Sequence, residues 1–287
     1  MNRNSANKTP SYWLKEILAH LLIYSQLIIV AVIILFPVIW IVGSSFGNTI
    51  SLDQSKPIPD DPTIRNYLNL ISTTNYVRWY KNTFFVASVN MIFSIMVSTL
   101  TSYAFARFSF KGKKAGLLTI LVLQMFPSFL GMTAIYILFL NFNLLDNLLG
   151  LALIYIAGQI PYNTWLMKGY MQNIPKSLDE AALIDGAGKF KVFYKIIIPL
   201  AFPMITFIAV STFMAPWMDY ILPRLLISSD HKKTLAIGLF ELINNEMNAN
   251  FTMFAAGAVL VAVPITLLYM SLQKFLIHGV TAGASKE

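Results

Sequence analysis

The one long segment of mixed charge between two apolar runs is Ser177–Pro199. Within it, Ser177 and Glu180 have the spacing of a capping box, in which the serine oxygen accepts a hydrogen bond from a backbone N–H and the glutamate bonds back to the start of the helix. Gly186 is placed to end that helix, because glycine adopts the left-handed conformation at little cost. A second short helix is expected from Lys189 to the end of the segment. The spacing therefore predicts a compact helix-turn-helix that stands out from the apolar runs on either side.

The sequence lacks two features that would point to particular chemistry, a cysteine and a phosphate-binding loop. It has no cysteine, so a thiol nucleophile, a disulfide and a cysteine-ligated metal site are all excluded. The phosphate-binding pattern GxxxxGK[ST] is missing, because Gly188 and Lys189 are followed by Phe190 and no glycine stands at the earlier position. We therefore expect that the chain is not an enzyme and holds no metal or cofactor. Any ATP and Mg²⁺ would be bound by a partner subunit.

Composition places the chain among polytopic membrane proteins, because 56% of its residues are hydrophobic, only 12% are charged and the mean hydropathy is +0.64. A helix needs about 20 apolar residues to span a bilayer. The sequence predicts an all-α fold with an N-terminal segment at 1–20 and a transmembrane domain at 21–287, which includes the polar loop 177–199 and a tail at 277–287. Six spans are predicted, at about 21–42, 84–106, 117–140, 148–167, 200–222 and 253–276.

The placement of cations indicates which side of the membrane each connection faces. The net charge is +8, but no basic patch interleaved with aromatic residues points to nucleic acid. The turn 107–114 has four cations and no acid, whereas the turn 141–147 has Asp146 and no cation. Since cytoplasmic loops carry an excess of Lys and Arg, we expect both termini and the segment 177–199 in the cytoplasm. The expected location is the inner or plasma membrane of a bacterium or archaeon.

The spacing within the polar loop resembles the EAA loop of permeases from ATP-binding-cassette (ABC) importers. The family pattern is EAA-x3-G-x9-I-x-L-P, and the stretch from Glu180 to Pro199 departs from it only at Ile198, which replaces a leucine. The resemblance implies that the short helix docks into a groove of the ATPase subunit and transmits its motion. The alternative is a capped helix at the membrane surface with no docking role. The implied contact residues are Glu180, Ala181, Ala182, Asp185, Gly186 and Pro199.

Motifs nearer the C-terminus resemble the smaller permease subunit of maltose/maltodextrin importers, the MalG-like group. They lie at Thr234–Gly238, Phe254–Ala258, Val263–Thr266, Gln273–Phe275 and Gly279–Gly283. The resemblance implies the ABC type I importer permease fold and three partners: a second homologous permease, an ATPase dimer and an extracytoplasmic solute-binding protein. The resemblance also implies two contacts. One is a loop that contacts the binding protein, with Thr234, Leu235, Gly238, Asn244 and Asn245; the other is a tail that reaches the ATPases, with Thr281 and Gly283. The alternatives are a plain surface loop and a disordered end.

Uncharged polar residues within the predicted spans are candidates for lining a pathway. The spans carry no ionisable side chain deep in their interior, which argues against a proton- or sodium-driven carrier. Amide side chains suit neutral, hydroxyl-rich solutes. Hydrogen bonding between helices is the alternative role, and it adds roughly 0.6–2 kcal/mol per contact. The candidates are Asn90, Gln124, Gln159 and Asn163.

The sequence as a whole favours the permease subunit of an ATP-driven importer for oligosaccharides, similar to maltose/maltodextrin permeases and forming half of the translocation pathway. A permease for another solute, such as a galacto-oligosaccharide, polyol, glycerol phosphate or amino acid, is the first alternative. Glycerol phosphate is disfavoured, because a phosphate predicts Arg or Lys within the spans. A stand-alone channel or secondary carrier, or a membrane scaffold, would not explain the spacing of the EAA-like loop.

Overall fold

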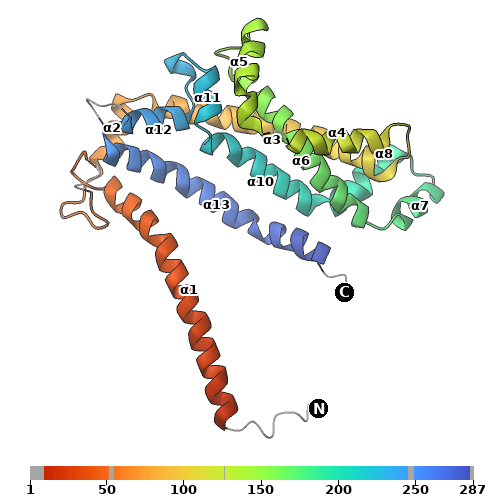
Figure 1. Ribbon diagram of the computed structural model, residues 1–287, viewed down its shortest axis with the longest axis horizontal. Helices are drawn as coiled ribbons and strands as arrows, with labels where there is room; N and C mark the ends of the chain where they lie inside the picture. Colours follow the sequence, from red (N-terminus) through yellow and green to blue (C-terminus); the bar gives the residue numbers. More distant parts are fainter. Residues whose placement is uncertain (1–9, 52–54, 126, 245–248, 285–287) are drawn as a thin grey trace.

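The computed structural model describes residues 10–51, 55–125, 127–244 and 249–284, and within these ranges the chain is helical with no strand. An all-α fold is thus confirmed for the described residues. Figure 1 shows the long helices α3, α10 and α13 running roughly along the long axis of the molecule, whereas α1 leads away from them. The α-helices are α1 Pro10–Ser45, α2 Arg65–Thr73, α3 Tyr76–Arg107, α4 Lys113–Met125, α5 Met132–Asn141, α6 Leu148–Asn173, α7 Ser177–Ile184, α8 Lys189–Val192, α9 Ile198–Leu200, α10 Phe202–Met218, α11 Ile221–Leu226, α12 Leu235–Ile243 and α13 Phe251–Ala284.

Helices occupy all six predicted spans, but the count of six is not established. By length and hydropathy, three described segments can cross a membrane: Glu16–Ser45, Tyr76–Arg107 and Phe251–Gln273. Two further spans result if each of two bent helix pairs is one broken crossing. The fourth predicted span lies in α6, a continuous helix of 26 residues that does not meet the same criterion.

One predicted span is broken, and another begins at a sharp bend. The third is divided into Lys113–Met125 and Phe129–Asn141, which meet at 86°. Pro127 lies at this break in an extended conformation, where its ring prevents the helix from continuing. The fifth, predicted at 200–222, begins at a 73° bend between Lys189–Leu200 and Phe202–Met218, and its helix ends at Met218, before the predicted end. Backbone freed by such breaks is tolerated at membrane depth only where protein or water satisfies it.

A stripe of small polar residues on α3 forms the centre of the bundle. Asn90, Ser94, Ser98 and Ser102 recur every four residues, so they lie on one face of the helix, and all four are buried. The Ser102 hydroxyl donates to a backbone carbonyl of α6 at 2.9 Å. Small side chains let backbones approach closely, and α3 accordingly packs against both α6 and α10. The second predicted span is therefore covered by other helices on its polar face.

The first helix has little cover within the chain. It begins at Pro10, while the part that is long and apolar enough to cross a membrane is Glu16–Ser45, so the N-terminal segment 1–20 stays a prediction. α1 packs on α13, and in Figure 1 its N-terminal half leads away from the bundle. Apolar side chains are exposed all around it, including Ile33 at 66%. A helix that is apolar on every side needs lipid or another protein around it.

The connections between the long helices gather at two ends of the bundle (Figure 1). At one end the α3–α4 turn meets α7, through an ion pair between Arg107 and Asp179. At the other end the α5–α6 turn meets the α11–α12 connection, through Asp146 and Ser229. The turn 107–114 and the segment 177–199, which are predicted on the same side of the membrane, thus lie at one end, and the turn 141–147 lies at the other. Which end faces the cytoplasm stays a prediction from the placement of Lys and Arg.

Close packing of α12 on α3 generates a stability prediction. A Cβ at Gly238 would lie 2.2 Å from the ring of Trp79, whereas a Cβ at Gly158 would meet nothing within 4 Å. Overpacking a tight contact costs about 1–3 kcal/mol. We expect Gly238→Ala to lower the Tm of the purified chain in detergent, and Gly158→Ala, the matched control, to leave it unchanged or slightly higher. Equal Tm values for the two variants would contradict the packing of α12.

Candidate functional site

The polar loop 177–199 folds as two short helices joined by a turn. The first, α7, begins at Ser177 with Lys176 at the N-cap, and no side-chain hydrogen bond caps it. The Lys176 carbonyl instead accepts from the N–H groups of Asp179 and Glu180 at 3.0 and 3.1 Å. The predicted capping box is therefore wrong, because Ser177 already has a helical position. Asp179 and Glu180 still favour the helix N-terminus, since negative charge there interacts well with the helix dipole.

Gly186 ends α7 as predicted. Its φ of +82° lies in the left-handed region, which a residue with a Cβ seldom adopts. The N–H of Ala187 donates back to the Ala182 carbonyl at 2.9 Å and closes the turn. The second helical part starts at Lys189 as α8, continues as a π-helical segment at Phe193–Ile197 and reaches Leu200 as α9. The predicted helix-turn-helix is confirmed.

The far side of the helix-turn-helix exposes large apolar side chains. Ile184 is 86% exposed and Phe190 77% exposed, with Leu178 and Leu183 also on the surface. Of the residues implied by the EAA resemblance, only Ala182 is partly covered; the others, Glu180, Ala181, Asp185, Gly186 and Pro199, are exposed. Apolar surface rimmed by charged groups marks sites of protein contact. The geometry thus leaves the implied residues free to meet a partner.

The near side of the segment is fixed to the bundle. Arg107 forms an ion pair with Asp179, with 2.7 Å between Nε and Oδ2, and its Nη2 donates to the Ile174 carbonyl at 3.0 Å. Below α8, Phe193 packs on Tyr103 with ring centres 4.6 Å apart. A cavity of about 360 Å³ lies between α3, α7 and α8 and is lined by both members of the ion pair.

Three of the four candidate pathway residues come from the facing helices α3 and α6. Asn90 is fully buried and donates to the Thr212 carbonyl at 2.7 Å and to Gln159 Oε1 at 3.3 Å. Asn163 is 2% exposed, and its Nδ2 has no hydrogen-bond partner. Gln124 is exposed near the end of α4, just before the break at Pro127. The structure therefore gives Asn90 an interhelical role, and the pathway role of all four stays a prediction.

The predicted contact loop is largely a packed helix. Residues 235–243 form α12, and Thr234, Leu235 and Gly238 are buried against the bundle. The Leu235 N–H donates to Thr83 of α3 at 2.8 Å. The segment is thus a packed helix and not a loop, and its contact with a binding protein stays a prediction. Asn244 is exposed, and Asn245 lies outside the described residues.

The predicted tail is helical as far as it is described. Thr281 and Gly283 belong to the last turns of α13, which ends at Ala284 and so extends beyond the predicted end of the span at 276. The structure describes the backbone here and not the side chains. A contact of this tail with a partner stays a prediction.

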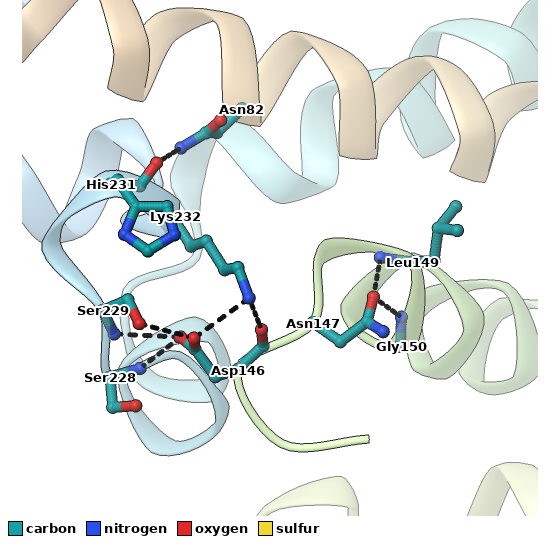
Figure 2. Close-up of polar contacts among 9 residues, drawn as sticks. All are labelled: Asn82, Asp146, Asn147, Leu149, Gly150, Ser228, Ser229, His231 and Lys232. Atoms are coloured by element: carbon teal, nitrogen blue, oxygen red, sulfur yellow. Dashed lines mark hydrogen bonds and ion pairs between the residues drawn. The ribbon is translucent and has the colours of Figure 1, made fainter. Parts of the chain in front are cut away.

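A cluster of polar contacts at the opposite end of the bundle was missed by the sequence analysis (Figure 2). Asp146, in the α5–α6 turn, accepts from the N–H groups of Ser228 and Ser229 at 3.1 and 2.9 Å and from the Ser229 hydroxyl at 2.5 Å. Lys232 donates to the Asp146 carbonyl at 2.6 Å and lies 3.1 Å from its carboxylate. Asn82 of α3 donates to the His231 carbonyl at 3.0 Å. The cluster ties three distant parts of the chain together.

The carboxylate of Asp146 is held in its charged form. Burial by itself would raise its pKa, but hydrogen bonds from Ser229, Lys232 and Ser228 outweigh that effect and hold the pKa well below the usual range. Its φ of +53° places it in the left-handed region that Asp and Asn tolerate. The turn at 141–147 could be recognised from the sequence. The hydrogen-bond partners of Asp146 could not, because they lie more than 80 positions away and no local pattern indicates them.

Comparisons with known proteins agree with this architecture. A family model described as "Binding-protein-dependent transport system inner membrane component" matches residues 94–281. The chain is 41% identical to the galactooligosaccharides transport system permease protein GanQ of Bacillus subtilis (strain 168), covering 92% of this chain and 94% of the relative. It is 38% identical to the maltodextrin transport system permease protein MdxG of the same organism, covering 92% and 95%.

A third relative and a solved structure extend the likeness. The maltodextrin transport system permease protein MalD of Streptococcus pneumoniae (strain ATCC BAA-255 / R6) is 37% identical, covering 95% of this chain and 98% of the relative. A chain from the crystal structure of a bacterial ABC transporter that imports the acidic polysaccharide alginate matches with a TM-score of 0.78. That match covers 94% of this chain and 99% of the other, at 24% identity, and shows a shared fold.

The Asp146 cluster generates a pH-dependent prediction. Asp146→Asn keeps the left-handed backbone and the side-chain size but loses the charge, so we expect a loss of about 1 kcal/mol of stability at pH 7. A carboxylate with a lowered pKa contributes stability above its unfolded pKa of about 4 and loses that contribution as the pH falls further. The difference in Tm between wild type and variant should therefore shrink as the pH is lowered from about 6 to about 3.

The matched control is Asp60→Asn, because Asp60 pairs with Lys56 only at the exposed surface. We expect this variant to have the Tm of the wild type throughout the same pH range. A Tm difference for Asp146→Asn that is constant with pH would contradict the proposed state of its carboxylate.

Proposed function

The chain belongs to the family of inner-membrane components of binding-protein-dependent transport systems, and from this premise we propose that it imports a neutral oligosaccharide. It is a permease subunit of an ABC importer, a transport component and not an enzyme. The single observation that carries the mechanism is the helix-turn-helix at 177–199, which has the EAA-like spacing and exposes the implied contact residues at one end of the bundle.

Two observations support a neutral sugar as the substrate. The relatives with the highest identity reported above are named for galactooligosaccharides and for maltodextrin. The polar groups between α3 and α6 include amides and hydroxyls, among them Asn90, Gln159 and Asn163. Amides can donate to and accept from sugar hydroxyls. Maltodextrin is the first candidate, and galacto-oligosaccharide is the second because GanQ, the 41% identical relative, is named for it.

The proposed partners follow from the exposed surfaces. An ATPase dimer, which would bind the ATP and Mg²⁺, would receive the exposed face of α7 from the cytoplasm, where both termini of the chain would also lie. A second permease and lipid would cover α1, since a single chain leaves its apolar side chains exposed. A solute-binding protein would dock at the opposite end, near the Asp146 cluster. This arrangement lets ATP-driven closure of the ATPases alternate the access of the pathway.

The proposal is tested with the tagged chain purified from detergent-solubilised membranes of its native host. ATPase activity is measured with the binding protein empty, loaded with maltodextrin or loaded with galacto-oligosaccharide. Co-purification of a second permease and an ATPase, with stimulation by one loaded sugar, is expected. A chain that purifies alone and catalyses sugar uptake in vesicles without an ATPase would overturn the proposal.

Substitutions in the exposed loop should uncouple transport while leaving insertion intact. Glu180→Lys reverses a charge on the docking face, and Gly186→Asp places a Cβ at the φ of +82° that α7 needs for its end. We expect each to abolish uptake and to weaken ATPase association, because the geometry of the docking helix is lost. Co-purification and radiolabelled sugar uptake measure both effects.

The control for these variants is Gly188→Ala, since Gly188 has an ordinary φ of −68° and open space around it. It should retain normal uptake. If Glu180→Lys and Gly186→Asp bind the ATPase and transport as well as Gly188→Ala does, the docking role of the loop is wrong.

A further inference from the structure

The ion pair between Arg107 and Asp179 joins a spanning helix to the exposed helix α7. Arg107 is the last residue of α3, and Asp179 lies in the first turn of α7. Their side chains are only 5% and 15% exposed, and Nε and Oδ2 are 2.7 Å apart. Arg107 also donates from Nη2 to the carbonyl of Ile174, at the end of α6. One guanidinium thus holds the end of α3, the end of α6 and the start of α7 together.

Little else attaches α7 to the membrane-spanning part. None of its residues is fully buried; Ala182 contributes a partly buried methyl group to the core beneath α8. Among the described residues, no other ion pair connects α7 to a spanning helix. A pair this sheltered differs from an exposed one, because removing either partner leaves the other charge without compensation in a poorly solvated place.

The middle of α3 makes polar contacts at the centre of the bundle. Asn90, on the same helix, donates to Gln159 of α6 and to the Thr212 carbonyl of α10. A continuous α-helix transmits displacement along its axis with little loss, since its backbone hydrogen bonds resist bending. A force on α7 that reaches Arg107 is therefore delivered through α3 to the polar contacts between α3, α6 and α10.

We propose that Arg107 is a positioning residue that fixes α7 to α3 through Asp179, so that movement of the docked helix passes into the bundle instead of being absorbed by the turn at its base. The inference rests on the proposed function, because it concerns how a force from the ATPase reaches the pathway. It assigns Arg107 and Asp179 a role in transmission and none in binding the ATPase or the sugar.

The first test measures sugar uptake per ATP hydrolysed in proteoliposomes that contain the complete importer. Arg107→Gln and Asp179→Asn are each expected to lower this ratio about tenfold, within the usual size of coupling between sites, while the ATPase still co-purifies. The double variant should be no worse than either single one, because both remove the same contact. Arg107→Lys keeps the charge with fewer donors and should give an intermediate ratio.

Lys176→Gln is the matched control. Lys176 lines the same cavity beside α7, and its exposed side chain makes no ion pair within the described ranges. This variant should retain the wild-type ratio. If it lowers the ratio as much as Arg107→Gln does, the effect comes from local charge, and the proposed role of the pair is wrong.

A second measurement does not depend on activity or assembly. The chain has no cysteine, so spin labels go only where cysteines are introduced. Leu100→Cys on α3 and Ile184→Cys on α7 are both at exposed positions, 49% and 86%. Double electron–electron resonance between the two labels should give a narrow distance distribution. We expect Arg107→Gln or Asp179→Asn to broaden this distribution and Lys176→Gln to leave it unchanged. An equally narrow distribution in all variants would overturn the proposal.

The outcomes separate this inference from the proposed function. A wild-type chain that assembles with no ATPase contradicts the proposed function. A wild-type importer that works, with Arg107→Gln and Asp179→Asn variants that assemble and transport with the same ratio, contradicts the positioning role alone. If Arg107→Gln does not insert, Asp179→Asn carries the same comparison, because it leaves the arginine and its bond to Ile174 in place.

Discussion

A polar group buried between the long helices of this chain is costly unless it finds a partner inside the protein, because neither lipid nor the neighbouring apolar side chains can supply one. The stripe from Asn90 to Ser102 meets this constraint by bonding within α3 and to the backbones of α6 and α10. Small side chains let the helices come close enough for those bonds. The relative placement of α3, α6 and α10, and of everything attached to their ends, depends on this pairing.

Local pattern was sufficient where a segment interacts mainly with itself. The helix-turn-helix at 177–199 was predicted, with the end of its first helix at Gly186, because these features depend on a few neighbouring residues. The polar face of α3 is likewise visible in the sequence, because its Asn and Ser residues recur every four positions. The capping box failed because the helix starts one residue earlier than the pattern implied.

Features that depend on distant contacts could not be predicted. The buried positions of Thr234 and Gly238 result from packing on Trp79 and Thr83, which lie far away in the sequence. Asp146 was recognised as an acid in a short turn, but its partners at 228–232 come from a connection whose fold the sequence did not reveal. Pro127 marks the place of the bend in the third span, but a proline in a membrane helix is compatible with both a kink and a full break, so its size could not be predicted.

The two polar clusters at opposite ends of the bundle have different mechanical consequences. At the Asp146 end, backbone N–H groups and carbonyls supply most of the bonds, so the α5–α6 turn and the α11–α12 connection are joined as parts of one rigid surface. At the Arg107 end, two side chains and one carbonyl join α7 to the spanning helices, and most of the helix surface stays exposed. A rigid end suits recognition of a partner without change of shape. A helix held at one point and free elsewhere suits the transfer of motion, since its exposed face can follow a moving partner while its base stays attached to α3.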